Sequence, residues 1–172
     1  LFNRIFNKKY FHNFLAFIIL LIYIAMFSAY IWIYLIPFNL TSNISFIFLL
    51  LICTSTDIGG FVFGKLIGGK KLTKISPNKT YSGVVGSFIF PLILGYFFYN
   101  YFSDLLKFEI NILIIIFVIS LISQFGDLII SFLKRKAKIK DTGNILPGHG
   151  GILDRIDGIL LALPIGFVLI SF

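Results

Sequence analysis

Charged residues are scarce in this sequence, and their scarcity excludes most classes of soluble protein. Only 13% of the 172 residues are Asp, Glu, Lys or Arg, whereas 58% are hydrophobic. A soluble domain is also about half apolar, but about a quarter of its residues are charged. We therefore expect a chain that lies in a lipid bilayer, and its 22 phenylalanines suit helices that face lipid.

Cysteine is almost absent, because Cys53 is the only one in the chain. A single cysteine excludes an internal disulfide and a cluster of metal-binding thiolates. Acidic residues are also few, which leaves a net charge of +8. The basic residues lie in a few blocks instead of spreading over a polar surface. We interpret them as signals of membrane topology and expect no nucleic-acid partner.

An initiator methionine is missing, since the chain begins at Leu1. This start is typical of a fragment or a partial gene model and leaves room for helices upstream. The apolar run that follows Lys9 is too long for a secretory signal peptide, and no small-residue cleavage site closes it. We therefore predict that this run is a membrane span.

Five apolar runs approach or exceed the length of about 20 residues that a helix needs to cross a bilayer. They cover residues 14–36, 44–64, 84–102, 110–130 and 159–172, and the last needs several preceding residues to cross fully. Residues 37–43 predict an uncharged turn, and Pro91 predicts a kink in the third run. The sequence thus predicts an all-α integral membrane protein. It would be a polytopic bundle of about five transmembrane helices that forms a single membrane domain over residues 1–172.

Lys and Arg alternate between the connections of this predicted bundle. Three precede the first run, none lies in the next connection, five lie in residues 65–79, one follows the third run, and six lie in residues 134–157. Positively charged loops stay on the cytoplasmic side. We therefore place the N-terminus and both basic loops at the cytoplasmic face of the cell's inner membrane.

Two carboxylates, Asp57 and Asp127, lie inside the apolar runs or at their cytoplasmic ends. A carboxylate there costs a few kcal/mol, and such residues usually face the interior of the bundle and have a partner. One interpretation is a polar functional site near the basic loops. The alternative is a structural hydrogen bond or an ion pair with a loop lysine.

A second acidic pair, Asp154 and Asp157, follows a Pro-Gly-His-Gly-Gly turn. On a helix that begins near Ile152 the two carboxylates share one side, and the free N–H groups of the first turn face an anion. Carboxylates beside an anion site suggest Mg²⁺, which binds one or two carboxylates together with substrate phosphates. The alternative is a solvated helix start stabilised by its acids. His149 fits phosphate binding and turn stabilisation equally well.

The basic run between Lys134 and Lys140 could serve topology and attraction to anionic lipids alone. Its continuation into the glycine turn and the acidic pair favours a functional role. Upstream, Gly60 and Gly64 have the spacing that lets another helix pack closely. Lys79 and the adjacent Thr80 supply a charge and a hydroxyl suited to phosphate, although the order of a P-loop is absent.

These motifs together resemble the signature of the phosphatidate cytidylyltransferases, the CDP-diacylglycerol synthases. The main match is Ser131-x-Leu133-Lys134-Arg135-x₄-Lys140-Asp141-x-Gly143-x₂-Leu146-Pro147-Gly148-His149-Gly150-Gly151-x₂-Asp154-Arg155-x-Asp157. Upstream matches are Asp57-x₂-Gly60-Phe61-x₂-Gly64-Lys65-x₂-Gly68, Ser76-Pro77-x-Lys79-Thr80 and Gly126-Asp127-Leu128. The motifs extend over about residues 54–164. Ile130 stands where many members have Glu, so no role for a carboxylate is carried over to that position.

The resemblance implies transfer of CMP from CTP to phosphatidate, with Mg²⁺ as cofactor, in phospholipid biosynthesis. It is compatible with a second cation, monovalent or divalent, and with a homodimer. It implies Asp127 and Asp154 as metal ligands a few ångströms apart, with Asp157 and Asp141 next. The residues that it implies for binding phosphates and nucleotide are Lys79, Lys134, Arg135, Lys140, Ser76, His149, Gly150, Gly151 and Arg155. Asp57 would line the polar cavity.

Other functions fit parts of the sequence. A close variant is a cytidylyltransferase or CTP-dependent kinase that acts on another lipid, such as an isoprenoid lipid. An ion or solute transporter would use Asp57 and Asp127 as intramembrane carboxylates, but it gives no reason for the acids and glycines of the 134–157 loop. A non-catalytic membrane subunit is the third alternative.

Overall fold

The computed structural model describes residues 40–71, 79–108, 110–136, 139 and 153–170, and within the first 39 residues it describes 23, 25 and 27–29. On the last helix, side chains are described from residue 157 onward. The chain divides into two compact units, Leu1–Asn39 and Leu40–Phe172. The residues described in the first unit are helical, as predicted for the run 14–36, most of which lies outside the described residues.

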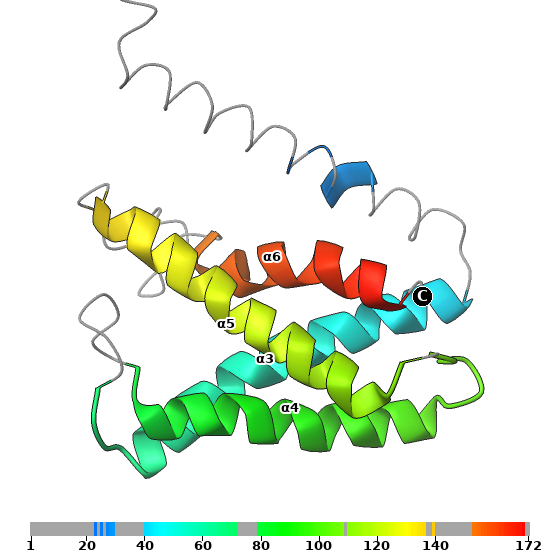
Figure 1. Ribbon diagram of the computed structural model, residues 1–172, viewed down its shortest axis with the longest axis horizontal. Coiled ribbons are helices and arrows are strands. Elements are labelled where there is room, and N and C mark those ends of the chain that lie inside the picture. The colour runs from blue at the N-terminus through cyan, green and yellow to red at the C-terminus, as the bar shows by residue number, and fades with distance from the viewer. Residues whose placement is uncertain are drawn as a thin grey trace, which may run out of the picture. The chain divides into compact units, whose positions relative to one another are not determined.

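Four helices form the described part of the second unit (Figure 1). They are α3 (Leu40–Leu66), α4 (Tyr81–Tyr101), α5 (Ile112–Lys136) and α6 (Leu153–Ile170). Helices α3, α4 and α5 are long and apolar enough to cross a membrane, and α6 contains a shorter apolar stretch, Asp157–Ile170. The predicted all-helical, multi-pass membrane protein is confirmed to this extent, and the count of five spans stays a prediction.

Two predicted boundaries are wrong. Residues 40–43, predicted as part of a turn, form the first turn of α3, because Thr41, Ser42 and Asn43 are polar but contain no helix breaker. Helix α5 continues to Lys136, so the basic residues at 134–136 lie in its last turn and not in a loop. Cations are favourable there because the last carbonyls carry partial negative charge, and long side chains can extend toward water. The predicted start of the last helix near residue 152 is confirmed.

Helices α3 and α4 approach each other closely, and both helices contribute glycines to the contact. A Cβ atom on Gly59 would lie 2.4 Å from the carbonyl oxygen of Gly86, and one on Gly86 would lie 2.3 Å from Cβ of Phe63. Gly64 lies beside Gly83, whose Cα would be 3.5 Å from an added Cβ. Close packing at the predicted Gly60–Gly64 motif is thus confirmed.

The apolar core of the bundle lies between α3, α5 and α6. Its fully buried side chains include Phe48, Leu49 and Ile52 of α3, Ile115, Ile116 and Ile119 of α5, and Phe167 of α6. Many other large apolar side chains are exposed, among them Phe61 and Phe97, which are both 68% exposed. Lipid tails are as apolar as these side chains, so the outward-facing residues are suited to a bilayer.

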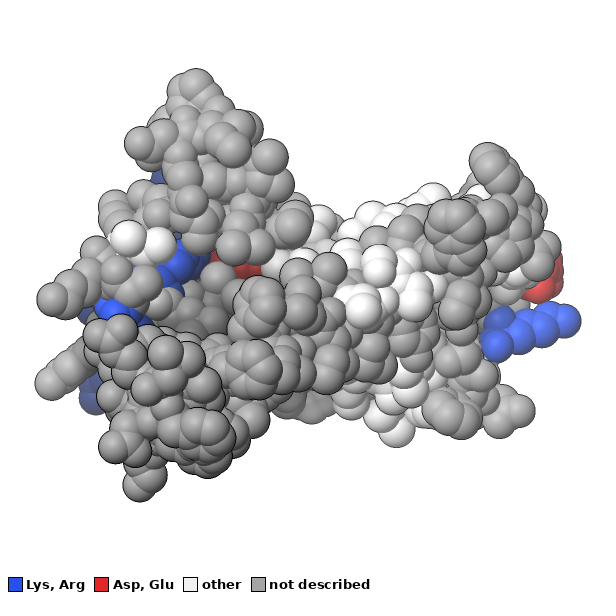
Figure 2. All heavy atoms as spheres, turned by 90° about the horizontal axis from the view of Figure 1, so that it is seen from above, with Lys and Arg blue, Asp and Glu red and all other residues white. Residues whose placement is uncertain are grey.

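Charge is concentrated at one end of the bundle. Figure 1 shows the α3–α4 connection, the C-terminal end of α5 and the start of α6 together at that end. In Figure 2, basic atoms gather there beside acidic atoms, and the described residues in the middle are uncharged. The described basic residues at this end are Lys65, Lys70, Lys71, Lys79, Lys134, Arg135 and Lys136. Lys107, in the connection between α4 and α5, is the described basic residue of the opposite end.

Candidate active site

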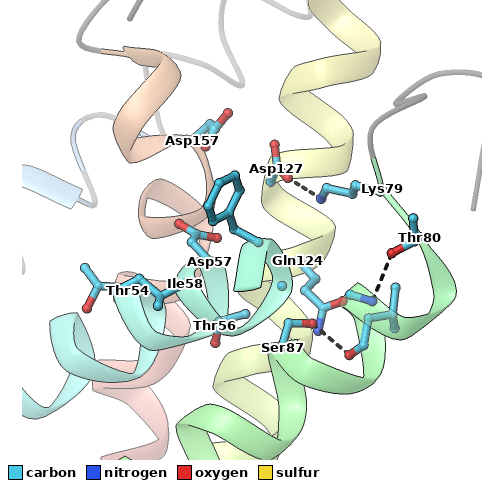
Figure 3. A pocket seen from close by; sticks show the side chains of 14 residues that line it. Thr54, Thr56, Asp57, Ile58, Lys79, Thr80, Ser87, Gln124, Asp127 and Asp157 are labelled. Atoms are coloured by element: carbon cyan, nitrogen blue, oxygen red, sulfur yellow. Dashed lines mark hydrogen bonds and ion pairs between the residues drawn. The ribbon is translucent and has the colours of Figure 1, made fainter. Parts of the chain in front are cut away.

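A cavity of about 710 Å³ opens at the basic end among α3, α4, α5 and α6. It combines charged, hydroxyl, amide and apolar groups (Figure 3). The polar lining residues include Asp57, Asp127, Asp157, Lys79, Thr54, Thr56, Ser87 and Gln124, and the apolar ones are Ile58, Phe61 and Val84.

Three carboxylates reach this cavity from three different helices. Asp57 comes from α3, Asp127 from α5 and Asp157 from the first turns of α6. Asp157 is only 8% exposed, Asp127 is partly buried and Asp57 is exposed. Gathering acids in a partly buried site is unfavourable unless positive charge compensates them. The grouping therefore predicts cations, from the protein or from a ligand, within the same cavity.

Two lysines supply part of that compensation. The ammonium group of Lys79 forms an ion pair with Oδ2 of Asp127, and Nζ of Lys134 lies 3.5 Å from Oδ2 of Asp157. Ser131 donates a hydrogen bond to Oδ1 of Asp127 at 3.3 Å. The ion pair with a loop lysine, the alternative raised for the intramembrane acids, is thus present at Asp127. Asp57 makes no hydrogen bond or ion pair with another described residue.

The turn after α3 returns the chain so that Lys79 faces the cavity. Gly68 and Gly69 adopt φ angles of 64° and 108°, which few residues other than glycine tolerate. The Tyr81 N–H then donates to the carbonyl of Lys70 at 3.2 Å. Gly68, the last glycine of the upstream motif, lies beyond the end of α3 and belongs to this turn.

Thr80 has a structural task next to Lys79. It is the N-cap of α4, and its hydroxyl oxygen accepts a hydrogen bond from the Gly83 N–H at 3.1 Å. Its Oγ1 also lies 2.9 Å from the hydroxyl of Ser82. The Thr80 hydroxyl, which the sequence suggested for phosphate binding, thus already satisfies one of the free N–H groups of α4. A bound phosphate would compete with this helix cap for the hydroxyl.

Several predicted site residues lie elsewhere or outside the described residues. Arg135 is exposed, and its Nη1 donates to the carbonyl of Ile139 at 3.4 Å. The residues outside the described part are Ser76, Lys140, Asp141, His149, Gly150 and Gly151. Asp154 and Arg155 lie on α6, but their side chains are outside the description as well. The predicted short distance between Asp127 and Asp154 stays a prediction.

The uncharged polar residues of the cavity were not predicted from the sequence. Gln124 lies three residues before Asp127, which places both on one face of α5. Thr54 and Thr56 precede Asp57 on α3, and Ser87 comes from α4. A signal for them existed, because an amide or hydroxyl beside an acid within an apolar run is itself unusual.

Comparison with known proteins identifies the family. The chain matches the cytidylyltransferase family over residues 2–172. This chain belongs to that family. It is similar to the phosphatidate cytidylyltransferase of Bacillus subtilis (strain 168), with 44% identity over 118 residues, covering 68% of this chain and 44% of the relative.

Two further relatives carry the same name. The protein of Helicobacter pylori (strain J99) is 40% identical over 129 residues, covering 75% of this chain and 48% of the relative. That of Rickettsia bellii (strain RML369-C) is 44% identical over 123 residues, covering 66% and 52%. The chain thus spans about half the length of the curated relatives it matches. The resemblance found in the sequence motifs is confirmed.

The donor set of this cytidylyltransferase cavity suits a hard cation. Carboxylate oxygens are the protein ligands that Mg²⁺ prefers, and Asp57, Asp127 and Asp157 all line the cavity. Within the described part of the chain, no group of three His, Cys, Asp or Glu residues is close enough to hold a metal ion. The Asp154 side chain, the other predicted ligand, lies outside that part.

Proposed function

We propose that this chain contains the reaction centre of an enzyme that transfers CMP from CTP to phosphatidate, forming CDP-diacylglycerol and pyrophosphate. The observation that carries the proposal is the gathering of three acids and Lys79 in one cavity at the basic end of an apolar bundle. Membership of the cytidylyltransferase family and the names of the relatives support this choice of substrates.

The chemistry explains why such a cavity is needed. An oxygen of the phosphatidate phosphate attacks the α-phosphorus of CTP, and the bond from that phosphorus to the oxygen shared with the β-phosphate breaks. The nucleophile is already anionic, so it needs little help from a base. The obstacle is repulsion between two polyanions. Fixed positive charge in a site with little water is an effective remedy.

The chain's own residues divide this task. Lys79 and Lys134 supply positive charge at the cavity, and both are already held beside carboxylates. We propose that Asp127 and Asp157, with Asp154 as a further ligand, hold Mg²⁺. When bound, the ion would neutralise phosphate charge and polarise the phosphoryl oxygens. Asp57 keeps the α3 side of the cavity polar.

The position of the cavity fits a substrate of two halves. Its charged groups lie at the basic end, which we assign to the cytoplasmic face of the inner membrane, where CTP is available. Its apolar lining includes Phe61, which is 68% exposed and can therefore contact lipid. The acyl chains of phosphatidate would remain in lipid while only the headgroup enters the cavity.

The test is transfer of label from CTP into lipid. The protein is placed in lipid nanodiscs with phosphatidate, Mg²⁺ and CTP that is labelled in its α-phosphate. We expect a labelled lipid product that disappears on chelation. Asp127→Asn should reduce its rate of formation by roughly a hundredfold or more, because the variant loses a charge at the reacting phosphates. Asp154→Ala should act similarly.

Asp104→Asn is the matched control, since it makes the same chemical change in the connection at the opposite end of the bundle. It should keep the activity of the unaltered protein. Unchanged activity in both Asp127→Asn and Asp154→Ala would refute the assignment of the site. Absence of any labelled lipid from the unaltered protein, when a phosphatidate cytidylyltransferase is active under the same conditions, would refute the proposed reaction for this chain.

A further inference from the structure

Gln124 is the feature of the cavity that the proposed reaction does not use. It lies on the same face of α5 as Asp127 and three residues before it, so it is about 4.5 Å further from the basic end. Its amide nitrogen Nε2 is buried and has no hydrogen-bond partner among the described residues. Leaving a buried N–H unpaired is costly, so the group is suited to a ligand.

Three hydroxyl groups of the cavity lining are already used. Thr54 and Thr56 donate to the carbonyls of Leu50 and Ile52 in their own helix, each at 2.8 Å. Ser87 donates to the carbonyl of Val84, also at 2.8 Å. A hydroxyl has only one proton to donate. Among these uncharged lining residues, Gln124 therefore has the donor that remains available to a bound molecule.

The surroundings indicate what kind of acceptor Gln124 would meet. The cavity is lined by the engaged hydroxyls and, nearer the basic end, by the apolar side chains of Phe61 and Val84. A ligand that extends from the basic end to Gln124 must pass these apolar side chains and present an oxygen that accepts a hydrogen bond. An ester carbonyl of a diacyl lipid meets both requirements, whereas the triphosphate of a nucleotide fits the charged end better.

We propose that Nε2 of Gln124 donates a hydrogen bond to an ester carbonyl of the lipid substrate and thereby favours ester-linked over ether-linked phosphatidate. This inference rests on the proposed function. With the phosphate at Asp127 and Lys79, the glycerol esters lie a few bonds further into the membrane. Gln124 lies one helical turn deeper in the same direction, so one bound lipid can contact both places (Figure 3).

The test compares two lipids that differ only in the carbonyl. Diacyl phosphatidate and its dialkyl ether analogue of equal chain length are bound separately to the full chain in nanodiscs, without CTP, and CMP transfer to each is then measured. The unaltered protein should prefer the diacyl lipid by roughly threefold to tenfold, as expected for one hydrogen bond. Methionine has a similar shape but no N–H. In Gln124→Met, the ratio of diacyl to dialkyl lipid bound should therefore fall to nearly one.

Two more variants separate this role from a general effect on folding. Gln124→Asn keeps the amide but shortens its reach, and it should also lose most of the preference. Ser120→Ala is the matched control on α5, because the Ser120 hydroxyl donates to the carbonyl of Ile116 at 2.8 Å and does not line the cavity. Its preference for the diacyl lipid should equal that of the unaltered protein.

The inference is overturned if the unaltered protein binds both lipids equally, or if Gln124→Met weakens both to the same degree. It is also overturned if the variant changes only the KM for CTP, since Gln124 would then contact the nucleotide. Selective binding that depends on Gln124 without any CMP transfer would support the inference and reject the proposed function. CMP transfer together with an unchanged lipid preference in Gln124→Met would support the proposed function and reject the inference.

Discussion

At the scale of single residues, the cavity carboxylates differ in how their charge is balanced. Asp127 has Lys79 as its partner, Asp157 has Lys134, and Asp57 has no ion pair among the described residues. Asp157 also accepts a hydrogen bond from the Gly158 N–H at 2.9 Å. A cation that binds at Asp127 must share or displace the ammonium group of Lys79. The lysine therefore both stabilises the acid and competes for it.

This competition predicts how Lys79→Met behaves. The Lys79 and Asp127 side chains are 28% and 24% exposed, so losing the pair should cost only about 1 kcal/mol. The thermal midpoint without divalent ions should fall by roughly 2–4 °C. Mg²⁺ should then stabilise the variant more than the unaltered protein, because the carboxylate has lost its competing cation.

Thermal unfolding in detergent, with and without Mg²⁺, measures this difference. Lys107→Met, at the exposed opposite end, removes the same charge far from the cavity and should respond to Mg²⁺ like the unaltered protein. An equal response of Lys79→Met and Lys107→Met to Mg²⁺ would show that no cation binds beside Asp127.

At the scale of helices, the contact between α3 and α4 determines where the cavity walls stand. Gly59 and Gly86 let the two backbones meet, and Gly60 and Gly83 line the cavity just beyond that contact. Lipid offers little hydrophobic drive for helices to associate, so close packing through small residues is a main source of stability. The glycines therefore hold Asp57 of α3 and Lys79, which precedes α4, at one cavity.

Adjacent glycines of α3 should respond very differently to alanine. A Cβ at Gly59 would meet the backbone oxygen of Gly86 at 2.4 Å and Cβ of Phe90 at 2.6 Å, so the helices must separate. Overpacking of this kind costs about 1–3 kcal/mol. A Cβ at Gly60 would meet Cβ of Ser87 at an ordinary 3.5 Å.

We expect Gly59→Ala to lower the thermal midpoint by roughly 2–4 °C for each kcal/mol, whereas Gly60→Ala should change it little. Fluorescence-detected size-exclusion chromatography after heating measures both variants. Equal stability of the two alanine variants would mean that α3 and α4 do not pack through Gly59.

At the scale of the whole molecule, the unequal charge of the two ends indicates orientation. Seven described Lys and Arg residues lie at the cavity end, against Lys107 at the other. Because basic loops stay cytoplasmic, the cavity should open to the cytoplasm. Cys53 is fully buried, so it should react little with a thiol reagent when introduced cysteines are labelled.

Cysteine labelling in oriented membrane vesicles tests this topology. Lys70→Cys and Lys136→Cys should react with a membrane-impermeant maleimide only from the cytoplasmic side, and Lys107→Cys only from the other side. The unaltered protein, with Cys53 alone, should remain unlabelled. Labelling of Lys70→Cys and Lys107→Cys from the same side would contradict the arrangement of α4 as a span.

Local patterns in the sequence were sufficient for several of these features. Apolar runs predicted the helices, because a bilayer selects segments by length and composition. Blocks of Lys and Arg predicted which connections lie at the same end of the bundle. The motif around Asp127 and Asp157 indicated the family. Boundaries at residues 40 and 136 were missed because polar and basic residues are tolerated in terminal helical turns, where water or lipid headgroups solvate them.

By itself, the sequence determined that the chain enters a membrane, which end carries the positive charge, and which acids are candidates for the site. Only the tertiary structure decided that Asp57, Asp127 and Asp157 share a cavity, that Lys79 pairs with Asp127, and that the Gln124 amide is left without a partner among the described residues. The physical reason is that these relations depend on how separate helices pack. Packing through Gly59 and Gly86 joins segments whose proximity no local pattern records.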